Sequence, residues 1–451
     1  MSLTVFINAG PWLPVPPSGY GGVENMLRYL IGELRGRGHR VILGTVEQSE
    51  IKVDQRETAF WEGQHPQIDA PYSDAVWVAH KHMHKMASVI RKTHDAEGID
   101  VVHDFLEIVG PTVLAELGPG TPPVLHTLQW NLRLHEEFYR DFDGRGRVFF
   151  NGISEPQMAA ATGSLRATKL GVVHNGVDVN DFTFREDKDD YVITLARFAS
   201  DKGQDIAARI CERLRLPLLM AGTVGGIDSP KLLKSELSKR DSPFHYYKDV
   251  EYYRRSVRPY ERRYRYRPWR GRDRRIEWIG SVGGEEKREL VAGARALLMP
   301  IRWEEPFGMA VIEALASGTP VVAMRHGAMP VIIQHGYNGF LADSEQEFEE
   351  CLQRVRSGEI QPGNCRRSVQ ERFSAARMAD RYVRLYEQVI GRSQPAASAP
   401  PAAPPTNGSG PGTNGAGNGR APASTLAELG PGPVLADATS SPNLLNADDP
   451  A

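Results

Sequence analysis

The sequence has few cysteines, no long apolar run and almost no net charge, and each absence excludes a class of protein. Only Cys211, Cys351 and Cys365 occur in 451 residues, outside any Cys-x-x-Cys or Cys/His cluster. Neither a disulfide framework nor a structural zinc site is therefore expected. No apolar run reaches the roughly 18 residues that a membrane-spanning helix needs. The formal net charge of -2 gives no basic field for nucleic acid.

The first ten residues lack the basic segment and apolar stretch of a signal peptide. They are typical of a buried first strand followed at once by a turn. We therefore expect a cytoplasmic protein, and loose attachment to a membrane surface stays open.

Short apolar runs alternate with amphipathic stretches throughout the chain. The first expected helix has one apolar stripe, formed by Met26, Leu27, Leu30, Ile31 and Leu34. Gly38 is typical of the end of such a helix. Alternation of strand and helix indicates parallel sheets covered on both faces. The predicted strands are Leu3–Ile7, Val41–Gly44, Val101–Phe105, Pro123–Leu128, Val148–Ile153, Tyr191–Arg197, Pro217–Ala221, Ile276–Ile279, Ala296–Ile301 and Pro320–Met324.

Two such series predict an α/β protein with two doubly wound, Rossmann-like domains that face a cleft. We place them at residues 1–175 and 176–374, because Asn175-Gly176 marks a turn before a polar stretch. An amphipathic helix over 375–392 closes the folded part. Residues 393–451 are rich in Pro, Ala, Gly, Ser and Asn, and we expect this tail to be disordered.

One internal segment, 252–275, interleaves tyrosines and a tryptophan with eleven arginines. Such mixtures can stack on bases and bind phosphates. Because the rest of the chain is not basic, we expect an exposed, partly helical insertion, with an anionic acceptor or partner as the alternative.

The strongest chemical signal lies in the second domain. Glu305 precedes an expected helix that starts near Met309, and Glu313 lies just past the first turn of that helix. Both can reach the carboxyl edge of the sheet, where ligands bind in open α/β folds. The helix N-terminus offers N–H groups to an anion, and the two carboxylates suit sugar and ribose hydroxyls. A helix cap and a solvated side chain are the structural alternative for this pair.

The block from Glu305-Pro306-Phe307-Gly308 through Glu313 to Ala316-Ser317-Gly318-Thr319-Pro320 resembles the signature of family 4 glycosyltransferases. These are retaining enzymes with the GT-B architecture, and the resemblance covers roughly residues 3–390. It implies a GT-B fold whose second domain binds a nucleotide diphosphate through Glu305, Phe307, Gly308, Met309 and Glu313. It also implies that the closing helix returns to the first domain.

Other segments extend this resemblance. Gly21 and Gly22 stand in a glycine loop where backbone can approach a phosphate, whereas Glu24 occupies the place of the third glycine in a dinucleotide fingerprint. This departure argues against a nicotinamide enzyme. Arg197 and Lys202 match the Gly-Arg…Lys-Gly element, with Ala196 in place of its glycine. They would neutralise the donor diphosphate, unless they are solvated surface cations.

The resemblance places a histidine near the donor sugar at a strand end, and we assign His126 to this position. The alternative is a core histidine with its polar atoms satisfied. His103 and Asp104 end another strand at the same edge, with packing as their other explanation. Ser154 and Glu155 are typical of a helix cap.

We therefore expect a retaining glycosyltransferase of the hexosyl-transferring class, with His126, Arg197, Lys202 and Glu305 as catalytic residues. Its donor would be a nucleotide-diphosphate sugar, and it would need no metal or other cofactor. Glycans, lipids and small metabolites all remain open as acceptors, and nucleic acid is not expected as a partner. The alternatives are a sugar-nucleotide epimerase or phosphorylase with the same cleft, and a non-catalytic sugar-nucleotide-binding protein.

Overall fold

A computed structural model describes residues 2–17, 19, 21–65, 72–263 and 275–393. Within these ranges the strands form two wholly parallel sheets, one in each half of the chain. The fold is therefore the doubly wound α/β arrangement expected from the alternating pattern. The predicted disordered tail lies outside the described residues, apart from Ser393.

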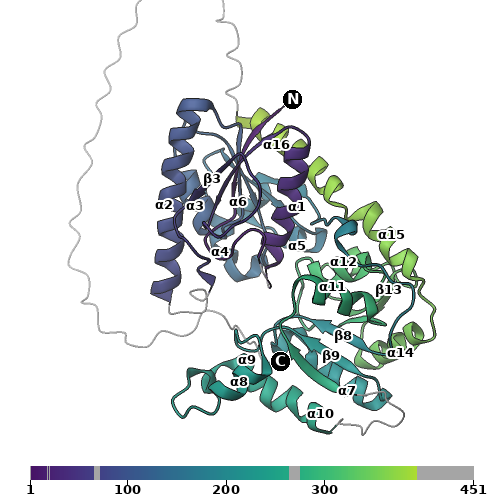
Figure 1. Ribbon diagram of the computed structural model, residues 1–451. Helices are drawn as coiled ribbons and strands as arrows, with labels where there is room; N and C mark the ends of the chain where they lie inside the picture. The colour runs from purple at the N-terminus through teal and green to yellow at the C-terminus, as the bar shows by residue number, and fades with distance from the viewer. Residues whose placement is uncertain (1, 18, 20, 66–71, 264–274, 394–451) are drawn as a thin grey trace, which may run out of the picture. The chain divides into compact units, whose positions relative to one another are not determined.

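The first sheet has the strand order β3-β2-β1-β4-β5-β6-β7. Figure 1 shows α1 and α2 on opposite sides of it. The strands are β1 (Thr4–Asn8), β2 (Arg40–Thr45), β3 (Gln55–Thr58), β4 (Val101–Asp104), β5 (Val124–Thr127), β6 (Val148–Gly152) and β7 (Lys169–Val172). The helices are α1 (Gly22–Gly36), α2 (Tyr72–Glu97), α3 (Val109–Ala115), η2 (Leu132–His135), α4 (Glu136–Asp141), α5 (Glu155–Ala159) and α6 (Gly163–Thr168).

The second sheet has the order β10-β9-β8-β11-β12-β13. Figure 1 shows α11 and α12 on one side of it and α7 on the other. Its strands are β8 (Val192–Leu195), β9 (Leu218–Ala221), β10 (Ile276–Gly280), β11 (Leu297–Met299), β12 (Val321–Met324) and β13 (Gly339–Ala342). The remaining helices are η3 (Val179–Asp181), η4 (Ser200–Lys202), α7 (Gln204–Leu214), α8 (Pro230–Glu236), η5 (Pro243–Tyr246), α9 (Lys248–Tyr252), η6 (Tyr253–Val257), α10 (Arg258–Arg263), α11 (Gly284–Gly293), α12 (Met309–Ala316), α13 (Met329–Ile332), α14 (Glu345–Arg356), α15 (Pro362–Arg372) and α16 (Ala375–Ser393).

Each predicted strand has a counterpart, and three further strands were missed. The residues of β3 are polar and half-buried, and β7 has one exposed and three half-buried residues, so neither shows an apolar run. Both lie at the edges of the first sheet. The third, β13, is fully buried but has only four residues in a glycine-rich segment. A strand is visible in the sequence as a run of apolar residues, which β3 and β7 lack and which the glycine-rich surroundings of β13 obscure.

The strand orders locate the two places where ligands bind in such folds. In the first sheet the winding reverses between β1 and β4, and in the second it reverses between β8 and β11. Loops that leave neighbouring strands in opposite directions at this point open a crevice at the carboxyl ends. Residues after β8 and β11 are therefore brought together although about a hundred residues separate them.

The structure corrects the expectation for the Arg/Tyr segment. Its first part is anchored rather than exposed: Tyr253 and Val257 are buried, and the Tyr253 ring lies 5.2 Å from that of Trp278. The Tyr252 hydroxyl donates to Asp205 Oδ1 at 2.7 Å. These contacts make the helical stretch up to Arg263 part of the second domain. Residues 264–274, which hold many of the arginines, lie outside the described residues.

The long helix α16 packs against α1, β4 and β5 of the first sheet. Its apolar face buries Met378, Tyr382, Tyr386 and Val389. The Tyr386 hydroxyl donates to His103 Nδ1 at 2.7 Å, and His103 Nε2 donates to Thr127 Oγ1 at 2.7 Å. Burial lowers the pKa of His103 well below its usual value, so this histidine is neutral. His103 is therefore a core residue, as the packing alternative held.

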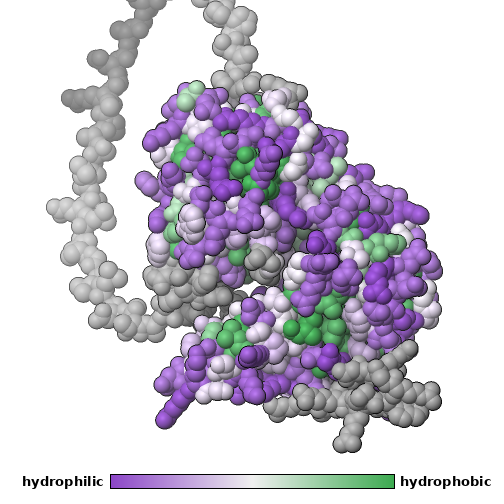
Figure 2. Space-filling model, viewed as in Figure 1, coloured by the Kyte–Doolittle hydropathy of each residue, from purple (hydrophilic) through white to green (hydrophobic). Residues whose placement is uncertain are grey.

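Hydrophobic side chains are mostly enclosed by these layers. Figure 2 shows a visible face that is mainly hydrophilic, with small hydrophobic patches. All three cysteines are free and buried. In the described ranges, every helix is too short or too polar to cross a bilayer.

We predict that Tyr386→Phe destabilises the protein, because it leaves His103 Nδ1 buried without a donor. The free energy of unfolding should fall by about 1–3 kcal/mol. Urea denaturation followed by tryptophan fluorescence measures this change. Tyr246→Phe is the control, since Tyr246 is 89% exposed and should tolerate the same change. Equal midpoints for wild type and Tyr386→Phe would contradict the prediction.

Candidate functional site

A largely buried ion pair joins the loops that follow β8 and β11. Lys202 Nζ lies 2.8 Å from Glu305 Oε2, and the two side chains are only 13% and 15% exposed. The pair stands at the winding reversal of the second sheet, where a ligand site is expected. The structure therefore brings together two of the predicted site residues that lie far apart in the sequence.

Trp303, a residue outside the predicted site, completes this cluster. The Trp303 ring lies 4.0 Å from Lys202 Nζ, within the range of a cation–π interaction. Its indole Nε1–H donates to Glu305 Oε2 at 3.1 Å. One side chain thus contacts both members of the ion pair.

The backbone around this pair is fixed at close range. Gly203 has a φ of +70°, and a β-carbon there would lie 1.9 Å from the carbonyl oxygen of Pro300, so glycine is required. Gly327 has a φ of +53° and would place a β-carbon 2.4 Å from Glu305 N. Arg302 N–H donates to the Asp201 carbonyl at 2.8 Å. The loops after β8, β11 and β12 therefore hold one another in place.

The second predicted carboxylate, Glu313, has a lysine partner of its own. Lys287 Nζ on α11 lies 2.6 Å from Glu313 Oε2 on α12, and the glutamate side chain is 9% exposed. Glu313 is thus neither a cap nor a solvated residue. Nothing in the α11 sequence marks Lys287 as special, since it lies among charged residues of a helix without a motif.

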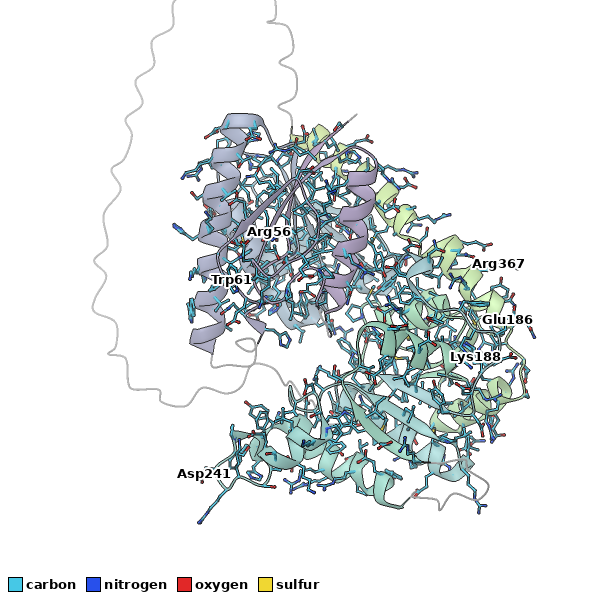
Figure 3. All side chains as sticks on the ribbon, in the orientation of Figure 1. Arg56, Trp61, Glu186, Lys188, Asp241 and Arg367 are labelled. Carbon is cyan, nitrogen blue, oxygen red and sulfur yellow. The ribbon has the colours of Figure 1, made fainter. Side chains whose placement is uncertain are left out.

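Another lysine ties the ends of these two helices together. Lys188, labelled in Figure 3, donates to the Ala292 carbonyl at 2.7 Å and to the Ser317 carbonyl at 3.3 Å, so it contacts the C-terminal ends of α11 and α12. A cation is favourable at helix C-termini. Burial lowers its pKa to about 8. Lys188 helps to fix the helices that carry Lys287 and Glu313.

Arg197 makes its ion pairs with other residues. Its guanidinium contacts Asp249 at 3.1 Å and Asp201 at 3.9 Å, and its side chain is 46% exposed. It follows β8, as predicted, but it does not share the buried pair formed by Lys202. Its role at a diphosphate stays a prediction.

The N-terminus of α12 has the predicted form. Gly308 is its N-cap with a φ of +103°, and Met309 is the first helical residue. The Phe307 side chain is buried between the rings of His174 and Phe373, at 6.1 and 5.9 Å. Only its backbone is therefore placed to contact a ligand. A β-carbon on Gly22 would lie 3.7 Å from Met309 Cγ, so the first-domain glycine loop reaches this helix.

That glycine loop leads directly into α1. Gly21 is the N-cap of α1 with a φ of +147°, and Glu24 lies in the first turn. Burial raises the pKa of Glu24 to about 7. A neutral carboxyl leaves the positive potential of the helix N-terminus available, as a phosphate would require.

His126 and Asp104 form a buried pair at the winding reversal of the first sheet. His126 Nδ1 donates to Asp104 Oδ2 at 2.5 Å. Asn8 Nδ2 donates to the other Asp104 oxygen at 2.6 Å, and His82 Nε2 donates to Asn8 Oδ1 at 2.8 Å. Among the described residues, His126 Nε2 is buried without a hydrogen-bond partner. The pair with Asp104 orients this nitrogen.

Ser154 caps α5 by accepting from Gln157 N–H, as expected. Across the described ranges, no three His, Cys, Asp or Glu side chains are grouped so that they could hold a metal ion.

Residues 270–372 match the family described as Glycosyl transferases group 1. The segment contains the predicted block from Glu305 to Gly318 and also Lys287. This segment of the chain is therefore similar to the group 1 glycosyl transferases, in line with the resemblance.

Curated relatives match over short segments. The N-acetyl-alpha-D-glucosaminyl L-malate synthase of Bacillus anthracis is 30% identical over 108 residues, which cover 23% of this chain and 28% of the relative. The D-inositol 3-phosphate glycosyltransferase of Streptomyces griseus is 42% identical over 65 residues, 14% of each chain. These matches span less than a third of either relative.

Solved structures match over far more of the chain and show the fold. AviGT4, a glycosyltransferase involved in avilamycin A biosynthesis, is 21% identical with a TM-score of 0.57, covering 86% of this chain and 98% of its own. Sucrose-phosphate synthase of Thermosynechococcus elongatus is 17% identical with a TM-score of 0.62, covering 86% and 99%. Anabaena HepE, solved with UDP and glucose, is 16% identical with a TM-score of 0.57, covering 86% and 100%. The fold is GT-B.

We predict that ionisation of Glu24 costs stability. The unfolded chain releases this proton near pH 4.5 and the folded protein only near pH 7, so the contribution of the neutral carboxyl is lost as the pH rises through 7. Glu24→Gln should therefore raise the free energy of unfolding at pH 8 by up to about 3 kcal/mol and change it little at pH 4.5. Urea unfolding at both pH values measures this difference. The exposed Glu50→Gln is the control, and an equal effect of Glu24→Gln at both pH values would refute the prediction.

We also predict that Lys287 and Glu313 are energetically coupled. Lys287→Met should lower the free energy of unfolding by about 1–3 kcal/mol, because the Glu313 carboxylate stays buried without its lysine. Adding Glu313→Gln should recover part of this loss, since it removes the charge. A double-mutant cycle from urea unfolding tests the coupling. Strictly additive changes would show that the pair contributes nothing.

Proposed function

We propose that the chain is a retaining glycosyltransferase that transfers a sugar from a nucleoside-diphosphate sugar to an acceptor. The observation that carries this proposal is the largely buried Lys202–Glu305 pair at the winding reversal of the second sheet. It offers a cation for a diphosphate and a carboxylate for sugar hydroxyls within one site. The match to group 1 glycosyl transferases includes the segment that holds Glu305.

The proposed roles follow from the chemistry of each group. Lys202 and the N-terminal amides of α12 hold the leaving diphosphate, with Arg197 and the Gly22 backbone at its rim. These groups stabilise the negative charge that grows on the diphosphate as the sugar–phosphate bond breaks. Fixed cations of this kind can do the work of a metal ion, so we propose that no metal is needed.

Glu305 and Glu313 bind hydroxyls of the donor sugar and the ribose, because ionised carboxylates accept hydrogen bonds from them. His126 presents Nε2 to the donor sugar, and its fixed pair with Asp104 supports this role. Retention of configuration is proposed from the resemblance to family 4. The acceptor would bind on the first domain.

The structure of HepE was solved with UDP and glucose, so UDP-glucose is the first donor to test. GDP- and ADP-sugars complete the panel. Release of nucleoside diphosphate in the presence of candidate acceptors reports transfer. The anomeric configuration of the product, read by NMR, distinguishes retention from inversion. Release that needs inorganic phosphate would indicate a phosphorylase, and interconversion of the donor without acceptor would indicate an epimerase.

We predict that Glu305→Ala and Lys202→Ala each lower the rate of transfer by about 10²–10³ or more, because each removes a charged contact to the donor. The folded state should persist, as judged by circular dichroism. Glu286→Ala and Lys234→Ala are matched controls on exposed helical positions and should keep the wild-type rate. Wild-type rates in the Glu305 and Lys202 variants would refute the proposed function.

A further inference from the structure

We propose that Trp303 is the positioning residue of the donor site, and that its two polar contacts act on different parts of the donor. The ring face holds the Lys202 ammonium, and the indole N–H orients the Glu305 carboxylate. This inference rests on the proposed function, because it assigns Lys202 to the diphosphate and Glu305 to the donor sugar.

The contact with Lys202 places the ammonium. A lysine side chain has several rotatable bonds, so one ion pair alone does not fix the position of its charge. The Trp303 ring lies 4.0 Å from Lys202 Nζ, and the Lys202 side chain is largely buried. An ammonium held over an aromatic face keeps its N–H groups available at the sides. Lys202 can then bind a second anion without losing the ring contact.

The contact with Glu305 selects one carboxylate oxygen. Trp303 Nε1–H and Lys202 Nζ both hydrogen-bond to Oε2. Within the described ranges, Oε1 receives neither of these bonds and stays available to a hydroxyl. An indole N–H can only donate a hydrogen bond, so Trp303 holds the Oε2 atom of Glu305 and leaves Oε1 outside this contact. Trp303 therefore keeps Glu305 oriented for a sugar even when Lys202 turns toward a phosphate.

The position of Trp303 in the chain supports this role. It lies two residues before Glu305, in the loop between β11 and α12 that the close contacts of Gly203 and Gly327 hold in place. The neighbouring Arg302 also binds the β8 loop, through its N–H to the Asp201 carbonyl and its guanidinium to Asp205 at 2.7 Å. The backbone of Trp303 is thus fixed independently of its side chain. Substitution of the side chain should leave the loop in place.

Two substitutions separate the two contacts. Trp303→Phe keeps an aromatic face for Lys202 and removes the N–H to Glu305. Trp303→Leu removes both contacts. A nucleoside diphosphate without its sugar tests the Lys202 side, whereas the intact sugar nucleotide tests both sides.

The experiment measures binding of UDP and of UDP-glucose by calorimetry, and of the GDP/GDP-mannose and ADP/ADP-glucose pairs if the wild type prefers another base. For Trp303→Phe we expect about a tenfold loss of affinity for the sugar nucleotide, the effect of one hydrogen bond to a charged group. Its affinity for the nucleoside diphosphate should stay within about threefold. For Trp303→Leu both affinities should fall. The affinity for the nucleoside diphosphate should fall by about 3- to 30-fold.

The exposed Trp61→Phe serves as the matched control and should bind both ligands like the wild type. Equal losses for both ligands in Trp303→Phe, or no loss in either variant, would overturn the role of Trp303. If Trp303→Leu fails to fold, the Phe variant still decides, because it keeps the aromatic ring. Normal donor binding by Lys202→Ala and Glu305→Ala would instead sink the proposed function, whatever the Trp303 variants show.

Discussion

An ion pair between a lysine and a glutamate from two separate loops sets the requirements for the rest of the second domain. Lys202 and Glu305 are both largely buried, so each needs its partner close by to offset the loss of hydration. Their approach requires that the loops after β8 and β11 nearly touch, which Gly203 makes possible by leaving no β-carbon against Pro300. The strand order provides the framework, because β8 and β11 are neighbours on which the chain winds in opposite directions.

Burial also restricts the charged residues of the first domain. Its buried polar residues are arranged so that few of them carry a net charge. His103 is neutral between Tyr386 and Thr127, and burial favours the neutral form of Glu24 at the N-terminus of α1. Asp104 accepts hydrogen bonds from Asn8 and His126, which orients the imidazole toward one free nitrogen. The network of Asp104 fixes His126 near the carboxyl end of a parallel strand, where ligands bind in such folds.

The sequence predicted the architecture because hydrophobic periodicity is strong in helices such as α1 and α16 and most strands read as short apolar runs. The stripe on α1 and the buried strands β4 to β6 follow directly from this pattern. Strands β3 and β7 escape prediction because edge positions do not need apolar residues, and β13 because it begins at Gly339 in a glycine-rich segment. The sequence of the Arg/Tyr segment indicates exposure because its many arginines conceal Tyr253 and Val257, which pack into the core.

Part of the candidate site was predictable because some of its residues stand in a recognisable motif. Glu305 and Glu313 stand in a compact motif, whereas Lys287 and Trp303 contribute through contacts that only the folded chain creates. Lys287 comes from another helix, and no spacing rule connects it with Glu313. Trp303 is close to Glu305 in sequence, yet its contact with Lys202 depends on the position of a loop about a hundred residues earlier. Contacts between residues that lie far apart in the chain cannot be predicted from a single sequence by its motifs or periodicity.

The pairing of Lys202 with Glu305 also sets a threshold for the anions that this lysine can accept. Any other oxyanion must bind Lys202 more favourably than the Glu305 carboxylate, which is already in contact, largely desolvated and held by Trp303. A small ion such as inorganic phosphate can offer Lys202 only its negative charge. Under the proposed function, a sugar nucleotide would also bring hydroxyl groups that bind the displaced carboxylate, so the buried charge of Glu305 would keep a partner. Discrimination among cellular phosphates would then arise from the glutamate as much as from the lysine.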